Sequence, residues 1–243
     1  MARIFISGSA DGLGHLAAKL LVSQGNQVVL HARNAKRGEE ALKKIPGAKN
    51  VLTADLSNME ETKKLAAEVN VLGQFDAVIH NAGVYQVSNH LIFAVNTLAP
   101  YILTCLIQKP KRLVYLSSGM HLSGNPSLKN METGRVSYSD SKLHDVILCL
   151  AVARKWPDVY ANAVNPGWVP TKMGGPGAPG NLLKGYETQA WLAVSNDDEA
   201  KVSGHYFYHK KQKRYVSEAA DAGVQEKFLT LCEELTGIRF PKE

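Results

Sequence analysis

The sequence predicts an α/β fold with a doubly wound, mostly parallel sheet of seven strands flanked by helices. One observation is an alternation along almost the whole chain, in which short, apolar, β-branched segments are followed by segments of helical hydrophobic spacing. Such alternation is typical of parallel strands joined by right-handed helical crossovers. A second observation is that the first apolar segment runs directly into a glycine-rich turn, "SGSADGLG" at 7–14, ahead of a helical segment.

The strands are expected where short apolar runs are bounded by turn residues, as in buried parallel strands. In chain order they are 3–7, 27–32, 50–54, 75–80, 112–117, 159–164 and 204–209.

The helices are expected where apolar residues recur at helical spacing, as Leu143, Ile147 and Ala151 do in the fifth of them. Their ranges are 13–24, 36–44, 58–70, 89–108, 138–155, 182–195 and 221–236.

The chain is expected to form one domain over 1–243. A Gly- and Pro-rich stretch at 165–181 does not divide it, because a helical segment and a further strand follow. We expect a dinucleotide-binding part at 3–117, a catalytic and substrate-binding part at 118–243, and a mobile loop near 172–190.

The composition, 45% hydrophobic and 21% charged over 243 residues, is that of a soluble globular protein. Cys105, Cys149 and Cys232 lie among apolar residues, which favours reduced thiols in the core of a cytoplasmic protein. The N-terminus lacks a signal-peptide pattern, and no apolar run is expected to reach the about 20 residues that span a bilayer. The histidines show no metal-ligand spacing, so no metal site is expected.

The net charge of +6 includes one dense basic run, "HKKQKR" at 209–214. We interpret it as a solvated face, because nucleic-acid binding would require interleaved aromatic residues or a binding motif. No nucleic-acid partner is expected.

The glycine turn predicts a nucleotide site and hence a Rossmann fold. Gly8 permits the tight turn, Gly12 lets backbone N–H groups approach a pyrophosphate, and Gly14 allows the helix to pack against the strand. The N-terminus of the following helix adds hydrogen-bond donors and partial positive charge.

Tyr138 and Lys142 stand four positions apart on one predicted helix, so their side chains share a face. A phenol with the ordinary pKa of about 10 exchanges protons poorly near neutrality. A cation within about 4–6 Å favours the phenolate. The pair therefore predicts a general acid for carbonyl reduction and a general base for alcohol oxidation.

Six motifs together resemble the short-chain dehydrogenase/reductase family. They are the glycine turn, "HNAG" (80–83), "VN" (95–96), "LSS" (116–118), "YSDSK" (138–142) and "NPGWVPT" (165–171), in the family's order. The C-terminal segment is similar to that of the retinol-dehydrogenase and carbonyl-reductase branches, so the likeness covers nearly the whole chain. It implies hydride transfer between a nicotinamide cofactor and a carbonyl or alcohol.

The resemblance implies catalytic roles for Asn96, Ser118, Tyr138 and Lys142. Ser118, beyond the fifth strand, is expected to hydrogen-bond the substrate carbonyl, with Ser117 as the competing residue. Asn96 is expected to hold a water behind Lys142, on a bent helix.

The cofactor is expected to contact a larger set of residues. These are Gly8, Ser9, Asp11, Gly12, Leu13, Gly14, Arg33, Arg37, Asp55, Leu56, Asn81, Ala82, Gly83, Tyr138, Lys142, Pro166, Gly167, Val169 and Thr171. By resemblance Asp55 and Leu56 border the adenine, although Ser57 beside them is also a candidate N-cap for the next helix.

The end of the second strand favours NADP(H) over NAD(H). A carboxylate there would hydrogen-bond a ribose hydroxyl and repel a 2′-phosphate, whereas this chain has Arg33, followed by Lys36 and Arg37. Asp11 departs from NADP-preferring relatives, in which a basic residue often takes its place.

The substrate is expected to be a hydrophobic small molecule. Residues 119–136 form an apparent insertion over the pocket, from which His121 is a candidate substrate contact. Trp168 and Met173 are further candidates, with simple packing an equal alternative for Trp168.

Two other functions compete with a reductase. A sugar-nucleotide epimerase or dehydratase shares the Tyr138–Lys142 spacing, but such proteins are usually longer and differ in glycine spacing. A non-catalytic NADP-binding regulator commonly lacks the tyrosine or the lysine. Substrate identity, reaction direction and the choice between a monomer and a homo-oligomer stay open.

Overall fold

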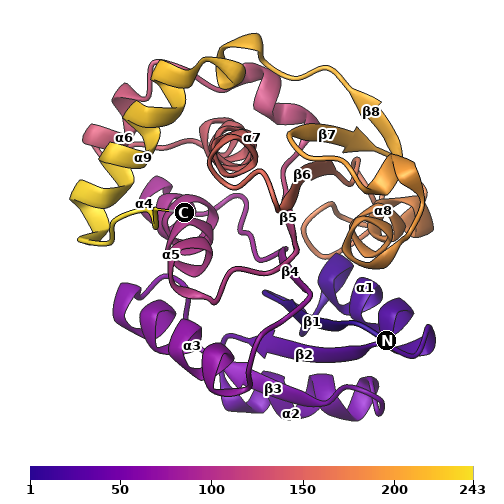
Figure 1. Ribbon diagram of the computed structural model, residues 1–243. Helices are drawn as coiled ribbons and strands as arrows, with labels where there is room; N and C mark the ends of the chain where they lie inside the picture. Colours follow the sequence, from indigo (N-terminus) through magenta and orange to yellow (C-terminus); the bar gives the residue numbers. More distant parts are fainter. Residues whose placement is uncertain (243) are drawn as a thin grey trace.

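The computed structural model describes residues 1–242 and places them in one eight-stranded sheet with helices on both faces (Figure 1). The strand order is β3-β2-β1-β4-β5-β6-β7-β8. The strands are β1 (Arg3–Ile6), β2 (Gln27–Ala32), β3 (Asn50–Thr53), β4 (Ala77–His80), β5 (Arg112–Leu116), β6 (Tyr160–Asn165), β7 (His205–Tyr208) and β8 (Lys211–Lys213).

The strand order reverses between β1 and β4. From β1 the chain builds outward through β2 to β3 and then returns to β4 on the other side of β1, with parallel pairing from β3 through β7. A crevice for ligands opens at the carboxyl ends of strands where such a reversal occurs. The expected doubly wound fold is confirmed.

The helices divide between the two faces of the sheet. Helices α1 (Gly12–Ser23), α2 (Ala35–Lys44) and α8 (Leu182–Val194) pack on one apolar core, through side chains such as Leu21, Ala41 and Leu192. Helices α3 (Met59–Val71), α5 (Ala99–Leu106) and α7 (Tyr138–Lys155) pack on a second core across the sheet, and α9 (Ala222–Thr236) lies outside α7 (Figure 1).

The remaining helical elements are short. They are α4 (Asn89–Ile92), the π-helix η1 (Phe93–Leu98), the 3-10 helices η2 (Gly119–Ser123), η3 (Asp198–Ala200) and η4 (Ser217–Ala220), and α6 (Lys129–Glu132).

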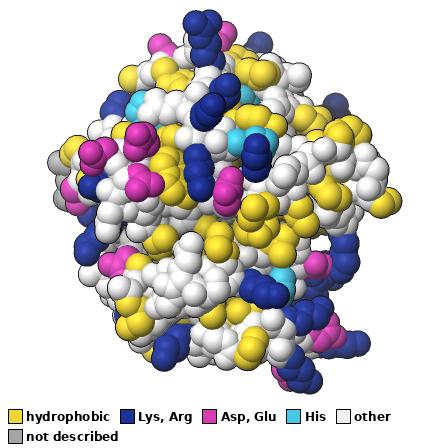
Figure 2. Space-filling view, turned by 90° about the vertical axis from the view of Figure 1, so that its right-hand side faces the viewer, with side chains coloured by type: hydrophobic (Ala, Val, Ile, Leu, Met, Phe, Trp, Pro, Cys, Tyr) yellow, Lys and Arg dark blue, Asp and Glu magenta, His cyan; other side chains and the backbone are white. Residues whose placement is uncertain are grey.

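The expected strand count was wrong by one. The basic run contributes β8, which pairs antiparallel with β7 through a turn in which His209 and Lys210 both have positive φ. Two central residues with positive φ match the right-handed twist of a hairpin. Lysines on this edge strand discourage pairing with another chain, and on this side of the molecule the basic side chains are interspersed with acidic and apolar ones (Figure 2).

The continuous helical run Asn89–Leu106 is long and apolar enough to span a membrane by length and composition alone, which corrects the expectation that no run approaches this length. Because 67% of it is buried inside the fold, it has the character of a core helix.

Candidate active site

A cavity of about 530 Å³ lies at the carboxyl ends of the central strands, between the glycine turn and the start of α7. It brings together most of the residues that the sequence singled out. Of these, the cavity is lined by Gly8, Asp11, Gly12, Leu13, Arg33, Arg37, Asp55, Leu56, Asn81, Ala82, Gly83, Tyr138, Lys142, Pro166, Thr171 and Met173.

The glycine turn fits closely against the end of β4. Gly8 has φ +64°, and a Cβ there would lie 2.7 Å from the Cα of Ala82. A Cβ on Gly14 would lie 2.3 Å from the Nδ2 of Asn81, whose amide donates to the carbonyls of Ser7 and Gly8 at 3.1 and 3.0 Å. At Gly12, by contrast, φ is +58° and an added Cβ would meet no atom within 4 Å. The turn is thus packed on one side and open toward the cavity.

Ser9 does not line the cavity, contrary to its expected cofactor contact. It is buried, its Oγ donates to the Ile6 carbonyl at 2.9 Å, and it accepts from the His31 amide at 2.9 Å. His31 was not expected in the site, yet it lines the cavity and its Nδ1 accepts from the Gly8 amide at 2.9 Å. Burial lowers the pKa of His31 to about 4, so the ring is neutral and able to accept.

Asp11 caps the N-terminus of α1, accepting from the Gly12 amide at 2.8 Å. Its other oxygen lies 2.5 Å from Lys172 Nζ and 3.6 Å from Arg37. The hydrogen bond from Lys172 lowers the pKa of the Asp11 carboxyl, which therefore stays ionised. Asp11, which stands where NADP-preferring relatives often have a basic residue, is thus paired with two cations, Lys172 and Arg37.

Asp55 lies at the far end of the cavity and accepts from both the amide and the hydroxyl of Ser57, at 3.0 and 2.7 Å. The N-cap of α3 is Asn58, which accepts from the Glu60 and Glu61 amides. The prediction of Ser57 as N-cap was therefore wrong, because α3 begins at Met59 and Asn58 takes the capping position.

A capping box positions Tyr138 and Lys142 at the start of α7. The Ser137 hydroxyl accepts from the Asp140 amide at 3.1 Å, while the Asp140 carboxylate accepts from the Ser137 amide at 3.0 Å. Asn125 and Asn130 donate to the same carboxylate, each at 2.8 Å. These bonds satisfy backbone N–H groups at the N-terminus of α7 and fix the position of its first residue, Tyr138.

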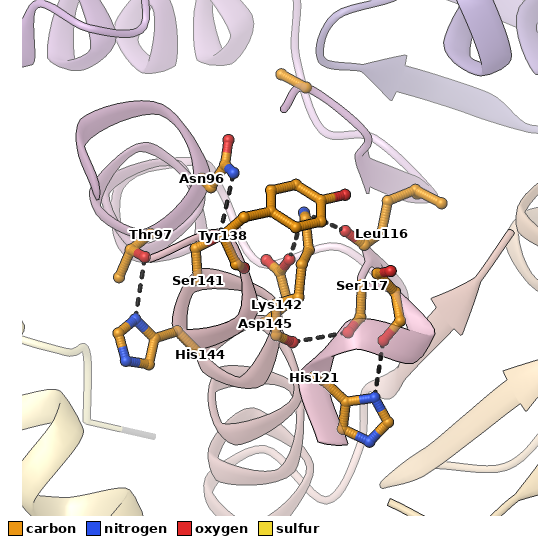
Figure 3. A network of polar contacts seen from close by, with 12 residues as sticks. Asn96, Thr97, Leu116, Ser117, His121, Tyr138, Ser141, Lys142, His144 and Asp145 are labelled. Carbon is orange, nitrogen blue, oxygen red and sulfur yellow. Dashed lines mark hydrogen bonds and ion pairs between the residues drawn. The ribbon is translucent and has the colours of Figure 1, made fainter. Parts of the chain in front are cut away.

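The Lys142 side chain lies beneath the Tyr138 ring, with Nζ 5.7 Å from the ring centroid (Figure 3). Nζ donates to the Leu116 carbonyl at 2.7 Å and to Asp145 at 2.8 Å. Burial alone would lower the pKa of the Lys142 ammonium, but the Asp145 carboxylate, with a smaller contribution from Tyr138, holds this pKa above its ordinary value. Asp145 was missed in the sequence, although its position three residues after Lys142 puts it on the same helix face.

Asn96 lies in η1, where the helix widens to a π-helix between α4 and α5. Its side chain accepts from the Val84 amide at 2.8 Å and donates to the Val84 carbonyl and Ser141 at 3.0 and 3.1 Å. A Cβ on Gly83 would lie 3.5 Å from Asn96 Oδ1 and 3.7 Å from Lys142 Nζ. Asn96 therefore clamps the segment after β4 beside the ammonium, without itself lining the cavity.

The two serines after β5 differ in burial and in the hydrogen bonds of their hydroxyls. Ser117 is buried and its hydroxyl donates to the Lys142 carbonyl at 2.7 Å. Ser118 is half-buried and its Oγ accepts from the Met120 amide at 3.2 Å, which leaves its hydroxyl proton available to another acceptor. This difference favours Ser118 as the donor to a substrate oxygen, although Ser117 and not Ser118 lines the cavity.

No residue of 119–136 lines the cavity, where an insertion over the pocket was expected. The segment packs on the N-terminus of α7 through Asn125 and Asn130. His121 is buried, with its ring 4.5 Å from that of Tyr206 and its Nδ1 2.8 Å from the Ser118 carbonyl. His121 is thus a support beneath Ser118 and not a substrate contact.

The segment after β6 is folded back on itself. The Trp168 indole donates to the Gly174 carbonyl at 2.8 Å and is 64% exposed, so it neither lines the cavity nor packs in the core. Val169 is buried beside Gly180 and Gly185, and Gly167 packs on Tyr208, so neither lines the cavity. The last part of the expected loop, 172–190, is helical instead, because α8 begins at Leu182 with Asn181 as its cap.

Exposed apolar side chains gather at this edge of the sheet. They lie in the three segments that follow β4, β5 and β6, and they are Tyr85, Val87, Met120, Leu122, Trp168 and Met173. We call these residues the apolar rim. The Tyr85 ring lies 4.6 Å from the Tyr138 ring, so the rim reaches the phenol of Tyr138.

The chain is similar to known proteins over its whole length. Residues 2–179 match the family described as short chain dehydrogenase. An uncharacterized oxidoreductase of Emericella nidulans is 46% identical over 254 residues, which cover 99% of each chain. Retinol dehydrogenase 13 of Homo sapiens is 27% identical over 283 residues, 98% of this chain and 85% of that protein. A crystal structure of an uncharacterized protein from Mycobacterium paratuberculosis matches with a TM-score of 0.80 at 24% identity, covering 99% and 95% of the two chains.

Proposed function

The chain belongs to the short chain dehydrogenase family, and we propose that within this family of oxidoreductases it reduces hydrophobic ketones or aldehydes with NADPH. The observation that carries the proposal is one continuous cavity with two different ends. One end holds the glycine turn and two arginines, and the other holds Tyr138 and Lys142. A phenol and an ammonium beside a dinucleotide site match the chemistry of carbonyl reduction.

The residues present fit a nicotinamide dinucleotide. The space at the Cβ position of Gly12 leaves the turn open toward the cavity, and the N-terminus of α1 begins there. Arg33 and Arg37 line the cavity beyond the end of β2, where a carboxylate would repel a 2′-phosphate. Arginine forks suit phosphate oxygens. These features support NADP(H) over NAD(H).

When bound, the nicotinamide supplies the hydride for the carbonyl carbon. Tyr138 donates a proton to the carbonyl oxygen, and the Ser118 hydroxyl hydrogen-bonds that oxygen as negative charge develops. Lys142 provides the positive charge beneath the phenol and holds the cofactor ribose. Asn96 and Gly83 keep the neighbouring segment in place around the ammonium.

The apolar rim supports a hydrophobic substrate. Six large apolar side chains at one edge form the kind of exposed surface that marks a binding site. A substrate with an apolar body would cover Tyr85 and Met173 while its carbonyl reaches Tyr138. The buried, reduced cysteines are compatible with the cytoplasmic location that we propose for the protein.

The test is NADPH oxidation by the purified protein with a panel of aromatic and aliphatic ketones, aldehydes and quinones. We expect turnover of apolar carbonyl compounds and a preference for NADPH over NADH. Tight NADPH binding with no turnover across the panel would contradict the proposal and favour a non-catalytic NADP-binding regulator.

A further inference from the structure

A buried carboxylate contacts the lysine of the catalytic pair. Asp145 Oδ2 lies 2.8 Å from Lys142 Nζ, and the two side chains are 3% and 6% exposed. Tyr138, Lys142 and Asp145 stand at positions i, i+4 and i+7 of α7, so all three share one helix face. Figure 3 shows the Asp145 carboxylate and the Leu116 carbonyl on either side of the ammonium.

We propose that Asp145 is a positioning residue, which fixes the Lys142 ammonium between itself and the Leu116 carbonyl and keeps it charged in a buried site. This inference rests on the proposed function, because it concerns the cation that serves Tyr138 in that reaction.

The need for such a residue follows from the burial of Lys142. A buried ammonium loses its hydration, and the neutral amine is then favoured unless a negative charge lies close. The Leu116 carbonyl offers a dipole, whereas Asp145 offers a full charge at hydrogen-bond distance. An ammonium also has only three donors. With two of them used by protein groups, the third is left for the cofactor side.

The other groups around Asp145 are neutral in the working pH range. Burial raises the pKa of Tyr115 on β5 and that of Cys149, which lies one turn further along α7. Burial lowers the pKa of His144 to about 4. Burial also raises the pKa of Asp145, to about 6, against the opposing effect of Lys142. Above that pH the pair is ionic, and the charge that faces the ammonium comes from Asp145.

The experiment compares Asp145→Asn with a matched control, Asp140→Asn. Both neutralise a buried carboxylate of α7, but Asp140 bonds Ser137, Asn125 and Asn130 and not Lys142. Lysine labelled with ¹³C at the ε-carbon reports the titration of Lys142, whose signal is assigned by its loss in Lys142→Arg. The pH profile of kcat and the Kd of NADPH are measured in parallel.

We expect Asp145→Asn to keep a hydrogen bond to Nζ but to lower the titration midpoint of Lys142 by about one pH unit or more. Its kcat, compared with the original protein, should fall progressively as pH rises, and Asp145→Glu should restore part of the profile. Asp140→Asn should lower thermal stability and, because the capping box carries Tyr138, lower kcat at every pH, but it should leave the titration midpoint of Lys142 unchanged. An unchanged Lys142 titration in Asp145→Asn, or the same shift in Asp140→Asn, would overturn the proposal.

Failure of the proposed function is a separate outcome. If the original protein reduces no substrate, the reductase assignment fails while the Lys142 titration still decides the role of Asp145. If Asp145→Asn does not fold, the original protein and Asp145→Glu carry the test. A Lys142 that loses its proton near neutral pH in the original protein would then refute the inference.

Discussion

The two ends of the cavity differ in how far their charged side chains are exposed to water. At the glycine turn, Asp11, Arg37 and Lys172 are 40%, 44% and 86% exposed in their side chains, and water screens their charges. At α7, Lys142 and Asp145 are almost fully buried. Exposed pairs contribute little to stability and adjust readily to a ligand, whereas a buried pair must be complete because each charge alone is costly. The exposed end is suited to selecting a ligand, and the buried end to holding a reactive group in place.

The largest expected effect comes from removing the phenol hydroxyl at the buried end. Tyr138→Phe should lower kcat by about 100-fold or more, because general acid catalysis contributes about 10²–10⁴-fold. The Kd of NADPH should stay near that of the original protein, because the ring and its neighbours are retained. Tyr160→Phe, at the amino end of β6 and away from the cavity, is the matched control, and its kcat should change little. Retention of a tenth of the rate in Tyr138→Phe would argue against the assigned role.

The same substitution at the two ends tests the comparison directly. Lys142→Met should lower the free energy of unfolding by about 3–5 kcal/mol, because it leaves the Asp145 carboxylate buried without its partner. Lys172→Met should cost less than about 1 kcal/mol, because its ion pair is exposed. Urea unfolding at pH 8 measures both. Equal costs would show that burial does not distinguish the two ends.

A buried neutral histidine supports each end, and together the two predict a pH dependence of stability. Burial lowers the pKa of His31, beneath the turn, to about 4, and that of His144, on the buried side of α7, to about 4. Below about pH 6.5 the unfolded chain takes up protons that the folded protein does not. Each histidine should therefore lower the stability by about 2 kcal/mol as pH drops from 7 to 5, and proton uptake by Asp145 in the folded protein should offset part of this loss.

Urea unfolding midpoints measured from pH 7 to pH 5 give the slope of stability against pH. His144→Asn is expected to make this slope shallower. The asparagine is neutral at every pH, and it is expected to keep a hydrogen bond to Thr97, which lies 3.1 Å from His144 Nδ1. An unchanged slope in that variant would mean that His144 takes up its proton at the same pH in the folded and the unfolded protein, which would contradict the lowered pKa.

The smallest effect is expected at the exposed end. Arg33→Asp should shift the ratio of kcat/KM for NADPH over NADH toward NADH by about 10-fold or more, because a charge-assisted bond to the 2′-phosphate is replaced by repulsion. Higher ionic strength should weaken NADPH binding more than NADH binding. Lys36→Asp is a control, since Lys36 neighbours these residues without lining the cavity. Equal shifts in both variants would point to general charge and not to a contact by Arg33.

Features set by short-range geometry could be predicted from the sequence. Tyr138 and Lys142 fall on one face because a helix turns every 3.6 residues. Gly8 and Gly12 adopt the positive φ that glycine tolerates. Apolar runs marked every parallel strand of the sheet, with ends shifted by a few residues. Only β8 was absent from the prediction, because three exposed residues acquire strand geometry from pairing with β7.

Features set by packing between distant segments could not be predicted in this way. Asp145 is visible in the sequence, but its partner depends on how deeply α7 is buried against β5. His121 and Ser9 are polar residues near the motifs, and the structure turns both inward, beneath Ser118 and β2.

By itself the sequence determined the α/β order, the turn that suits a dinucleotide and the helix face that carries Tyr138 and Lys142, because each depends on residues only a few positions apart. The tertiary structure alone decided which charges are buried together, which polar side chains support the site from behind, and that 119–136 packs on α7 and does not line the cavity. The physical reason is that desolvation and hydrogen-bond partners depend on contacts between segments far apart in the chain, which local spacing does not encode.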